Sequence, residues 1–562
     1  MSQTNKISAC SHLNAFMKCI PFMSVLFFSV DAAMAQKVKS KKEEISITSS
    51  FKPSILKTSK IEFYAAPPSK DETPYSFKYL PSHGVNNTTM PGFSIKPLAK
   101  IANEVPEDSA GVFAKLGYGN LQNPLAQLAY QSSNKSSDFS VWVDHASAKG
   151  KIENQQNDQT SAGLSFENMI NQSQRIFVFA GYDLSNFKQY GYDTSLFSFP
   201  KSDLLQQYNN INAGVTFTQL LGEESRTSVS PELLINHFSS NKSVVEVSGS
   251  MKVVIKHQVN AKFGIDFAPQ IQLASYKNDQ DSSRLYNLTQ LPLNISYLNK
   301  KFKFEGGGNA AIYKGKLTFA PNLNMSYQVG EKNVKILASV RNDFSLNTFR
   351  YLASTNPFIV APDSLSLAHR TDYSVGFNWE DGKGLQVKTT AGITHFKGLP
   401  LYINSGASGK DMKVLIESSL KAINLNANLD YVFSDKLVIK SSAEIFVFQK
   451  QVNYKEAYGL IPVRLSFGGE WKPFSPLTFK FNALLWKGSK STNDAKIDVL
   501  VNDAADINVG VDYKLNKKWA IWLDLNNIAN AQYQRWNQYD SYGFNLVGGI
   551  RYSFLNKKPT KK

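Results

Sequence analysis

Hydrophobic and polar residues alternate with a period of two along most of the chain, between residues 110 and 554. Within 317–329, the odd-numbered positions are Leu, Phe, Pro, Leu, Met, Tyr and Val, and the positions between them are small or polar. Similar stretches occupy 373–379, 477–485, 507–515 and 544–554. Such alternation indicates strands with one face in an apolar environment and the other in a polar one.

The length of these stretches favours strands that cross a membrane. Most of them reach nine residues or more, whereas strands of soluble proteins are usually about 5–6 residues long. A tilted strand needs about 9–11 residues to cross a bilayer. Because no water satisfies its backbone there, the sheet must close on itself.

Connectors of two lengths alternate along the chain. Short polar turns are predicted at 299–301, 330–333, 380–383, 434–436, 472–476 and 516–518, and longer connectors at 341–370, 398–411, 487–506 and 530–543; a tight link at 314–316 is an exception. Outer-membrane barrels have short periplasmic turns and longer outer loops. The prediction is an all-β fold: a closed antiparallel transmembrane β-barrel of about 22 strands, with an irregular N-terminal extension and both barrel ends on the periplasmic side.

The predicted barrel occupies residues 110–554, and three other segments flank it. Residues 1–35 are predicted to be a secretory signal peptide, because a short apolar core precedes the small-x-small box Ala33-Met34-Ala35; a buried helix is the alternative. Residues 36–109 hold eight of the 22 prolines and are expected to be irregular, in the lumen or the periplasm. Residues 555–562 form a basic periplasmic tail.

Cysteine content and charge restrict the chemistry. Both cysteines, Cys10 and Cys19, lie in the predicted signal peptide, so the expected mature chain has no disulfide and no cysteine metal ligand. Removing residues 1–35, with two lysines and one aspartate, changes the formal net charge from +17 to +16. A positive lumen would favour anionic solutes. Lysines in turns and at membrane interfaces are the favoured explanation, since many lysines lie in predicted turns.

No motif predicts a catalytic, cofactor-binding or metal-ligating residue, and no substrate-binding residue is identified. Asp144 and His145 are neighbours, but adjacent strand residues face opposite ways. No metal-binding spacing occurs among the seven histidines, which are His12, His83, His145, His237, His257, His369 and His395.

Two glycine-rich stretches and five tryptophans have structural interpretations. Residues 406–410 (GASGK) depart from nucleophile-elbow and phosphate-loop patterns and are interpreted as a flexible outer-loop tip. Residues 306–308 (GGG) are interpreted as a close strand contact or a bulge. An aromatic girdle near the strand ends is predicted for Trp471, Trp486, Trp519, Trp522 and Trp536.

A short motif near the C-terminus carries a family resemblance. Residues 527–533 (NIANAQY) match the pattern N-L-x-N-x-x-Y with Ile528 in place of leucine. Together with the final strand, 544–554, they resemble the last two strands of TonB-dependent outer-membrane receptors. The resemblance covers roughly 110–554. It implies a 22-stranded barrel in the outer membrane of a Gram-negative bacterium and, as a partner, a TonB-type energy-coupling protein.

The N-terminal segment departs from that family. Such receptors carry a globular plug of well over a hundred residues, whereas the 74 residues at 36–109 precede the barrel here. A reduced or absent plug is therefore expected. Residues 43–50 (EEISITSS) are similar to a TonB box or a first plug strand, and a short edge strand or linker is the alternative.

The expected function is that of a solute channel or transporter with a polar lumen, gated by residues 37–109 or by loops. No enzyme activity and no cofactor are expected. The expected partners are outer-membrane lipid, the TonB-type protein and another envelope protein, but not nucleic acid. The alternatives are a structural or partner-docking barrel without transport, a barrel enzyme, and a secreted β-rich adhesin.

Overall fold

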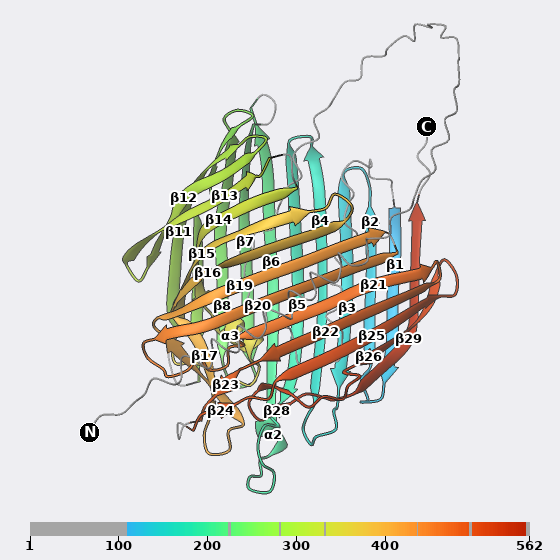
Figure 1. The fold of residues 1–562 in the computed structure, drawn as a ribbon. Coiled ribbons are helices and arrows are strands. Elements are labelled where there is room, and N and C mark those ends of the chain that lie inside the picture. Colours follow the sequence, from blue (N-terminus) through green and yellow to red (C-terminus); the bar gives the residue numbers. More distant parts are fainter. Residues whose placement is uncertain are drawn as a thin grey trace, which may run out of the picture. The chain divides into compact units, whose positions relative to one another are not determined.

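The computed structural model describes residues 109–557, except for 223–225, 280–282, 331–332, 435 and 494–496. The predicted signal peptide, the proline-rich segment up to residue 108 with its TonB-box-like stretch, and residues 558–562 of the tail lie outside the described residues. The described residues form one large antiparallel sheet (Figure 1).

The strands of this sheet are long. The first eight are β1 (Ser109–Gly119), β2 (Leu125–Ser133), β3 (Ser137–Ala148), β4 (Asn157–Asn171), β5 (Gln174–Lys188), β6 (Leu205–Leu221), β7 (Thr227–Ser240) and β8 (Val245–Gln258). The next eight are β9 (Phe263–Phe267), β10 (Gln270–Lys277), β11 (Arg284–Leu298), β12 (Phe302–Tyr313), β13 (Lys316–Gln328), β14 (Val334–Asn347), β15 (Ser366–Glu380) and β16 (Leu385–Lys397). The last seven are β19 (Leu420–Ser434), β20 (Leu437–Gln451), β21 (Val463–Phe474), β22 (Leu477–Lys487), β25 (Ala504–Lys514), β26 (Trp519–Asn526) and β29 (Asn545–Lys557).

The sheet closes into a barrel of 22 spanning strands, as predicted. Strand β1 pairs with both β2 and β29, which leaves no free edge. The sheet counts 23 strands, but β9 and β10 both pair with β8 and β11 and are therefore two halves of one spanning strand. The break lies at Ala268 and Pro269, because proline cannot donate to the ladder.

The two ends of the barrel differ, as the predicted connectors require. At one end, called the turn end, adjacent strands are joined by two to five residues, and Ser109 pairs there with Lys557. At the other end, called the loop end, connectors reach 22 residues (398–419), although 314–315 is a tight turn. Strand β29 continues past Phe554 to Lys557.

Asparagine side chains shape several turns at the turn end. The Oδ1 atoms of Asn134, Asn260, Asn299 and Asn516 each accept hydrogen bonds from the backbone N–H groups two and three residues later. An asparagine that bonds its own backbone in this way favours a compact turn. The local sequence therefore explains why the connectors at this end are short.

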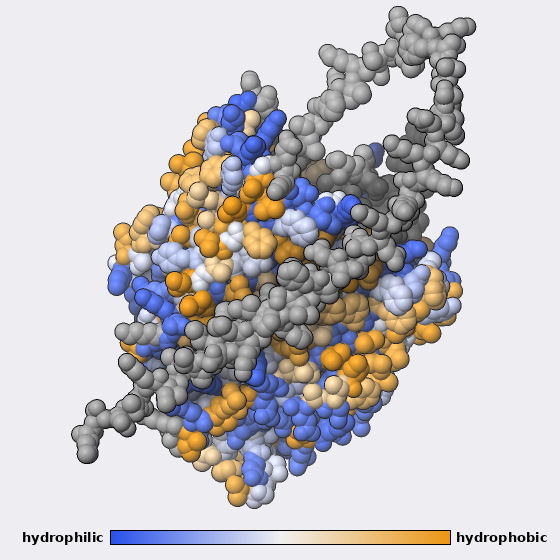
Figure 2. Space-filling model, viewed as in Figure 1, coloured by the Kyte–Doolittle hydropathy of each residue, from blue (hydrophilic) through white to orange (hydrophobic). Residues whose placement is uncertain are grey.

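The outer face of the barrel is apolar. On β13, Leu317 is 63% exposed and Phe319 is 70% exposed, whereas Ala320 on the opposite face is 2% exposed. Figure 2 shows hydrophobic residues spread over the outer face of the strands and mostly hydrophilic residues at the loop end. Among the described residues, no helix is long and apolar enough to cross a membrane.

Candidate functional site: the lumen and its lid

Five connectors at the loop end fold together, and we call them the lid. They are 348–365 with α3 (Phe349–Thr355), 398–419 with β17 (Leu399–Ser405) and β18 (Asp411–Glu417), 452–462, 488–503 with β23 (Lys490–Ser491) and β24 (Val499–Leu500), and 527–544 with β27 (Gln534–Trp536) and β28 (Tyr539–Asp540). The connector 189–204, with α2 (Lys201–Leu204), contacts them.

The lid has an apolar core that continues into the wall. Lid residues in the largest cluster include Phe349, Leu352, Phe358, Tyr402, Met412 and Tyr539, and wall residues include Tyr208, Phe238, Tyr276 and Leu288. A second cluster joins the lid to β19 and β20, and a third joins it to β22 and β25. Burial of each large apolar side chain contributes about 1.5–3 kcal/mol. These contacts hold the lid against strands at several places around the wall.

Helix α3 is seated by polar groups at both ends of its connector. The Thr348 hydroxyl accepts a hydrogen bond from the backbone N–H of Tyr351 and caps the helix. The buried carboxylate of Glu246, on β8, accepts from the backbone N–H of Phe349. Beyond the helix, the Tyr276 hydroxyl donates to the Pro362 carbonyl at 2.6 Å. These bonds hold α3 against the inner wall.

An aromatic stack joins two lid connectors that are distant in the sequence. The rings of Phe358 and Tyr539 lie 3.7 Å apart between centroids, with an interplanar angle of 16°. Tyr190 contacts both rings edge-on, and its hydroxyl donates to the Asp540 carbonyl at 2.7 Å. The Tyr539 hydroxyl donates to the carbonyl of Lys410. Four connectors therefore meet at one aromatic centre.

A buried carboxylate fixes the base of the β17–β18 hairpin. Glu417 is fully buried and accepts hydrogen bonds from four backbone N–H groups, those of Ser419, Val452, Asn453 and Tyr454, at 2.9–3.2 Å. Charge-assisted bonds of this kind are stronger than neutral ones. Connectors 398–419 and 452–462 are therefore tied together by one side chain.

An exposed ion pair links two further lid connectors. Lys455 Nζ and the Tyr458 hydroxyl lie 2.6 and 2.8 Å from the Asp498 carboxylate. The hydrogen bond from Lys455, followed by that from Tyr458, lowers the pKa of Asp498. Burial, reinforced by the hydrogen bond to Asp498, raises the pKa of Tyr458 to about 12. At neutral pH the carboxylate is charged and the phenol is protonated.

The outer part of β14 also bends into the lumen. The ladder between β13 and β14 ends at the pair Leu323 and Val340, although β14 continues to Asn347. Beyond this point Phe344 and Leu346 belong to the same buried cluster as the wall residues Ala311 and Ala320. This segment therefore narrows the opening beneath the lid.

The inner wall carries paired charges where the last strands meet the first. Asp512 on β25 is bonded to Lys480 on β22 at 2.7 Å and to Arg551 on β29 at 2.8 Å. Lys115 on β1 lies 3.4 Å from Asp524 on β26. Such charges are expected on a polar inner face, because in an apolar medium their desolvation would be costly.

A second polar group crosses β15, β16 and β19. The Asp372 carboxylate pairs with Arg370 at 2.7 Å and accepts a hydrogen bond from the Thr394 hydroxyl. Asn424 donates in turn to the Thr394 oxygen at 2.7 Å. The lumen is thus lined by polar groups on both sides of the barrel, as the period-two pattern predicts.

The described histidines make local contacts. His12 and His83 lie outside the described residues. Ring nitrogens of His145, His257 and His395 bond to hydroxyls of Thr160, Thr227 and Ser419, and His369 stacks on Phe344. Within the part of the chain that the structure describes, no three His, Cys, Asp or Glu residues gather as a metal site.

The glycine-rich stretches have different outcomes. Residues 406–410 form the tip of the β17–β18 hairpin, where Gly406 and Ala407 are exposed. The far side of the tip is bonded, since Asn404 Nδ2 donates to the Gly409 carbonyl and the Lys410 carbonyl accepts from the Tyr539 hydroxyl; the flexibility of the tip stays a prediction. At 306–308 the close strand contact is confirmed, since a Cβ on Gly307 would lie 2.0 Å from the Leu293 carbonyl oxygen. The register there is regular, so there is no bulge.

The girdle prediction is correct for only two of the five tryptophans. Trp471 and Trp519 are 47% and 42% exposed on the outer face near the turn end. Trp486, Trp522 and Trp536 are buried on the lumen side: their rings contact Tyr533, the Lys115 ammonium and Tyr402, respectively. Trp486 and Trp522 are inward-facing wall residues that were mistaken for lipid-facing ones, and Trp536 belongs to β27 of the lid.

The sequence interpretation allowed for gating by loops but identified none of the lid residues. The main lid residues, such as Phe349, Phe358 and Tyr539, lie in the long connectors that were expected to be outer loops. A signal was present, because solvent-exposed loops rarely carry so many large apolar residues. The pairing of those residues with one another has no periodicity and was not predictable.

The chain was compared with known proteins. It is similar to the FrpB iron transporter from Neisseria meningitidis, at 11% identity and a TM-score of 0.63 over 80% of this chain and 82% of that chain. The ferric enterobactin receptor PfeA from Pseudomonas aeruginosa gives 10% identity and a TM-score of 0.61, over 80% and 81%. The siderophore receptor PirA from Acinetobacter baumannii gives 8% identity and a TM-score of 0.61, over 80% and 81%.

No protein-family model and no curated protein sequence matches the chain. At identities near 10% the likeness concerns the fold. The described barrel has the architecture of the barrels of TonB-dependent siderophore and iron receptors, as the C-terminal motif led us to expect.

Proposed function

We propose that this barrel, with the architecture of TonB-dependent receptors, is a transporter integral to the outer membrane of a Gram-negative bacterium. A solute crosses its polar lumen, and the lid gates the loop end. The observation that carries the proposal is the combination of a polar inner wall with loop-end connectors that pack against that wall. Strands that form a continuous wall cannot open, whereas connectors can rearrange without breaking the sheet.

The proposed orientation places the turn end in the periplasm and the loop end outside the cell. Both barrel ends of the chain lie at the turn end, which agrees with the usual arrangement of outer-membrane barrels. The N-terminal segment, with its proposed role as a reduced plug, would then reach the lumen from the periplasm. Residues 43–50 are the proposed contact for a TonB-type energy-coupling protein.

Ferric chelates are the first solutes to test. The similar solved structures are an iron transporter and siderophore receptors. These structures resemble this chain in fold, and that resemblance is the reason for choosing this class of solute. We propose no enzyme activity and no cofactor, and the polar groups described above serve as lining and anchoring groups.

Conductance in planar bilayers tests the gate. The wild-type barrel is expected to show rare, brief openings, and replacement of 348–365 by a short Gly-Ser turn is expected to give a stable large conductance. Replacement of the exposed tip 193–198 by the same turn is the matched control and should leave conductance unchanged. If the lid-replaced barrel is folded but remains closed, the lid is not the gate.

The N-terminal segment requires a separate experiment. Deletion of 37–109 is expected to raise conductance further in the lid-replaced barrel, if that segment lines or occludes the lumen. An unaltered single-channel conductance would refute this role and leave the lid proposal intact. The same deletion should abolish uptake that depends on the coupling protein.

A structural or partner-docking barrel is the second candidate. A lid anchored by a buried carboxylate and an aromatic stack also suits a barrel that never opens. Copurification of a stoichiometric envelope protein, together with no conductance from the lid-replaced barrel, would favour this function over transport.

A further inference from the structure

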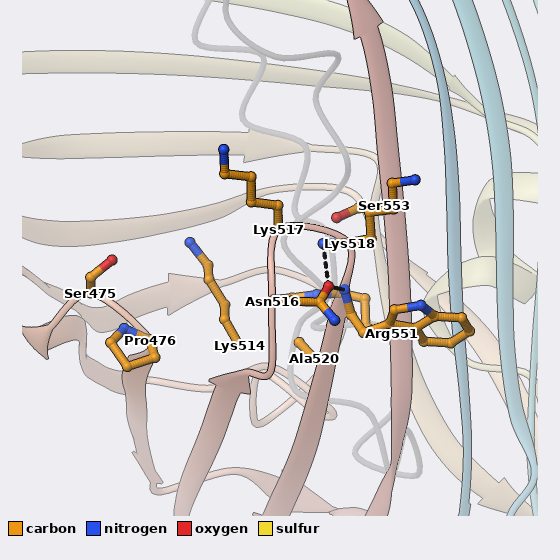
Figure 3. Close-up of a pocket in the computed structure, with 10 residues that line it drawn as sticks. Ser475, Pro476, Lys514, Asn516, Lys517, Lys518, Ala520, Arg551 and Ser553 are labelled. Carbon is orange, nitrogen blue, oxygen red and sulfur yellow. Dashed lines mark hydrogen bonds between the residues drawn. The ribbon is translucent and has the colours of Figure 1, made fainter.

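A cavity of about 480 Å³ lies at the turn end, against the inner wall of β25, β26 and β29. Four of its ten lining residues are cationic, namely Lys514, Lys517, Lys518 and Arg551, and none is acidic. Two serines and Asn516 supply further polar groups. Figure 3 shows the side chains of Lys514 and Lys517 extending in the same direction from the β25–β26 connection.

Strand register explains the shape of the cavity. Lys514 pairs with Ala520, and Ala520 pairs with Arg551. The three residues therefore form a row across adjacent strands, with the smallest side chain in the middle. Strands are about 4.8 Å apart, which places the backbones of Lys514 and Arg551 roughly 10 Å apart. The small side chain of Ala520 separates the two longer cationic side chains of the row.

One neighbouring carboxylate pairs with part of this row. The two oxygens of Asp512 bind Lys480 and Arg551, so two cations share one carboxylate. Among the described residues, no carboxylate lies within ion-pair distance of Lys514 or Lys517. The Lys518 ammonium lies 4.7 Å from the ring centroid of Phe554. An excess of positive charge therefore remains in a concave site, where the low-dielectric walls concentrate the field.

Turn formation does not require these lysines. The connection Asn516-Lys517-Lys518-Trp519 has the same hydrogen bonds as the connection Asn299-Lys300-Lys301-Phe302 at the same end of the barrel. The asparagine makes both turns, and the similar turns at Asn134 and Asn260 carry one lysine each, Lys135 and Lys262, in place of two. The paired lysines at 517 and 518 are thus available for binding.

We propose that this cavity binds a phosphate group. Several cations that line one concave site suit a multiply charged anion better than a single carboxylate, and lysine and arginine are the usual phosphate ligands in proteins. The phosphate could belong to a soluble molecule at the turn end or to a phospholipid headgroup. The site does not depend on whether the lumen conducts.

Isothermal titration of the full chain in a neutral detergent, with pyrophosphate as the probe, tests the site. Saturable binding is expected, and its affinity should fall as salt is raised, because salt screens the charges. The variant Lys514→Gln/Lys517→Gln removes both charges but keeps polar side chains, and it should weaken binding at least about tenfold, since hydrogen bonds to charged groups are among the strong ones. The matched variant Lys300→Gln/Lys301→Gln should bind like wild type.

Nanodiscs identify the source of the phosphate. If pyrophosphate binds in phosphatidylcholine discs but is displaced in discs that contain phosphatidylglycerol, the natural occupant is a lipid headgroup. Equal binding in both kinds of disc indicates a soluble phosphate. If wild type shows no saturable binding in detergent or in either disc, or if both lysine pairs weaken binding equally, the proposal is overturned.

Discussion

The stack between Phe358 and Tyr539 should control how often the lid opens. Phe358 is 1% exposed and also contacts Phe187 and Tyr190 edge-on, so Phe358→Ala removes a ring at the centre of the lid. Truncation of a buried phenylalanine costs about 3–5 kcal/mol. Because 1.4 kcal/mol changes an equilibrium constant tenfold, a loss of about 3 kcal/mol should raise the population of the open lid on the order of 100-fold.

A single cysteine can report this population. The two natural cysteines lie within the predicted signal peptide, so the expected mature chain offers no competing thiol. Val244 lies in the β7–β8 turn beneath the lid core and is 2% exposed. In Val244→Cys, a membrane-impermeant maleimide added outside should react slowly, at a rate set by local opening. Adding Phe358→Ala should accelerate labelling on the order of 100-fold.

The matched control is Phe319→Ala, which removes the same ring from the outer face of β13, where it is 70% exposed. Labelling of Val244→Cys should be unchanged in that background. Heat-modifiable gel mobility shows whether each variant retains the barrel. If Phe358→Ala leaves the barrel folded and changes the labelling rate by less than about threefold, the free energy of lid opening has changed by less than about 0.7 kcal/mol. In that case the stack does not hold the lid shut.

Three further outcomes are expected. Glu417→Gln leaves backbone N–H groups without an acceptor and should lower the free energy of local lid opening by about 2–3 kcal/mol. Proteolysis of 398–419 should therefore be faster, and unchanged cleavage would contradict the anchoring role. Gly307→Ala should lower the free energy of unfolding by about 1–3 kcal/mol through overpacking, because the new Cβ would meet the Leu293 carbonyl. The urea midpoint should fall as a result, and an unaltered midpoint would show that the strands can move apart. Because the pKa of Asp498 is lowered, its charged carboxylate stabilises the lid fully at pH values above the ordinary aspartate pKa of about 3.9. This stabilisation is lost as the pH falls through the lower pKa of the folded state. Proteolysis of 488–503 should therefore accelerate below about pH 4 in wild type, and Asp498→Asn should lack this acid step.

Local patterns predicted the wall accurately, as one strand and one turn illustrate. Leu317 and Phe319 alternate with Thr318 and Ala320, and the structure places these pairs on opposite faces. Each residue of a spanning strand faces either lipid or lumen, so side-chain polarity is directly readable along the chain. The Asn299 turn was equally local, because its hydrogen bonds reach only two and three residues ahead.

Residues that face the lumen near strand ends were harder to interpret. Trp486 and Trp522 have the residue type and the position of girdle residues, but their register places them inside. A shift of one residue moves a side chain to the other face, so strand-end tryptophans cannot be assigned without the exact ladder. The same holds for Lys514 and Arg551, whose row exists only because β25, β26 and β29 pair in that register.

The amino-acid order alone determined the barrel: the strand number, the position of the short turns and the apolar outer face. These features depend on whether a residue faces lipid or water, or on hydrogen bonds within a few residues, so the local sequence pattern predicts them. The lid was decided only by the tertiary structure. Phe358 and Tyr539 are 181 positions apart in the sequence, and such a pairing depends on where the closed wall places each connector.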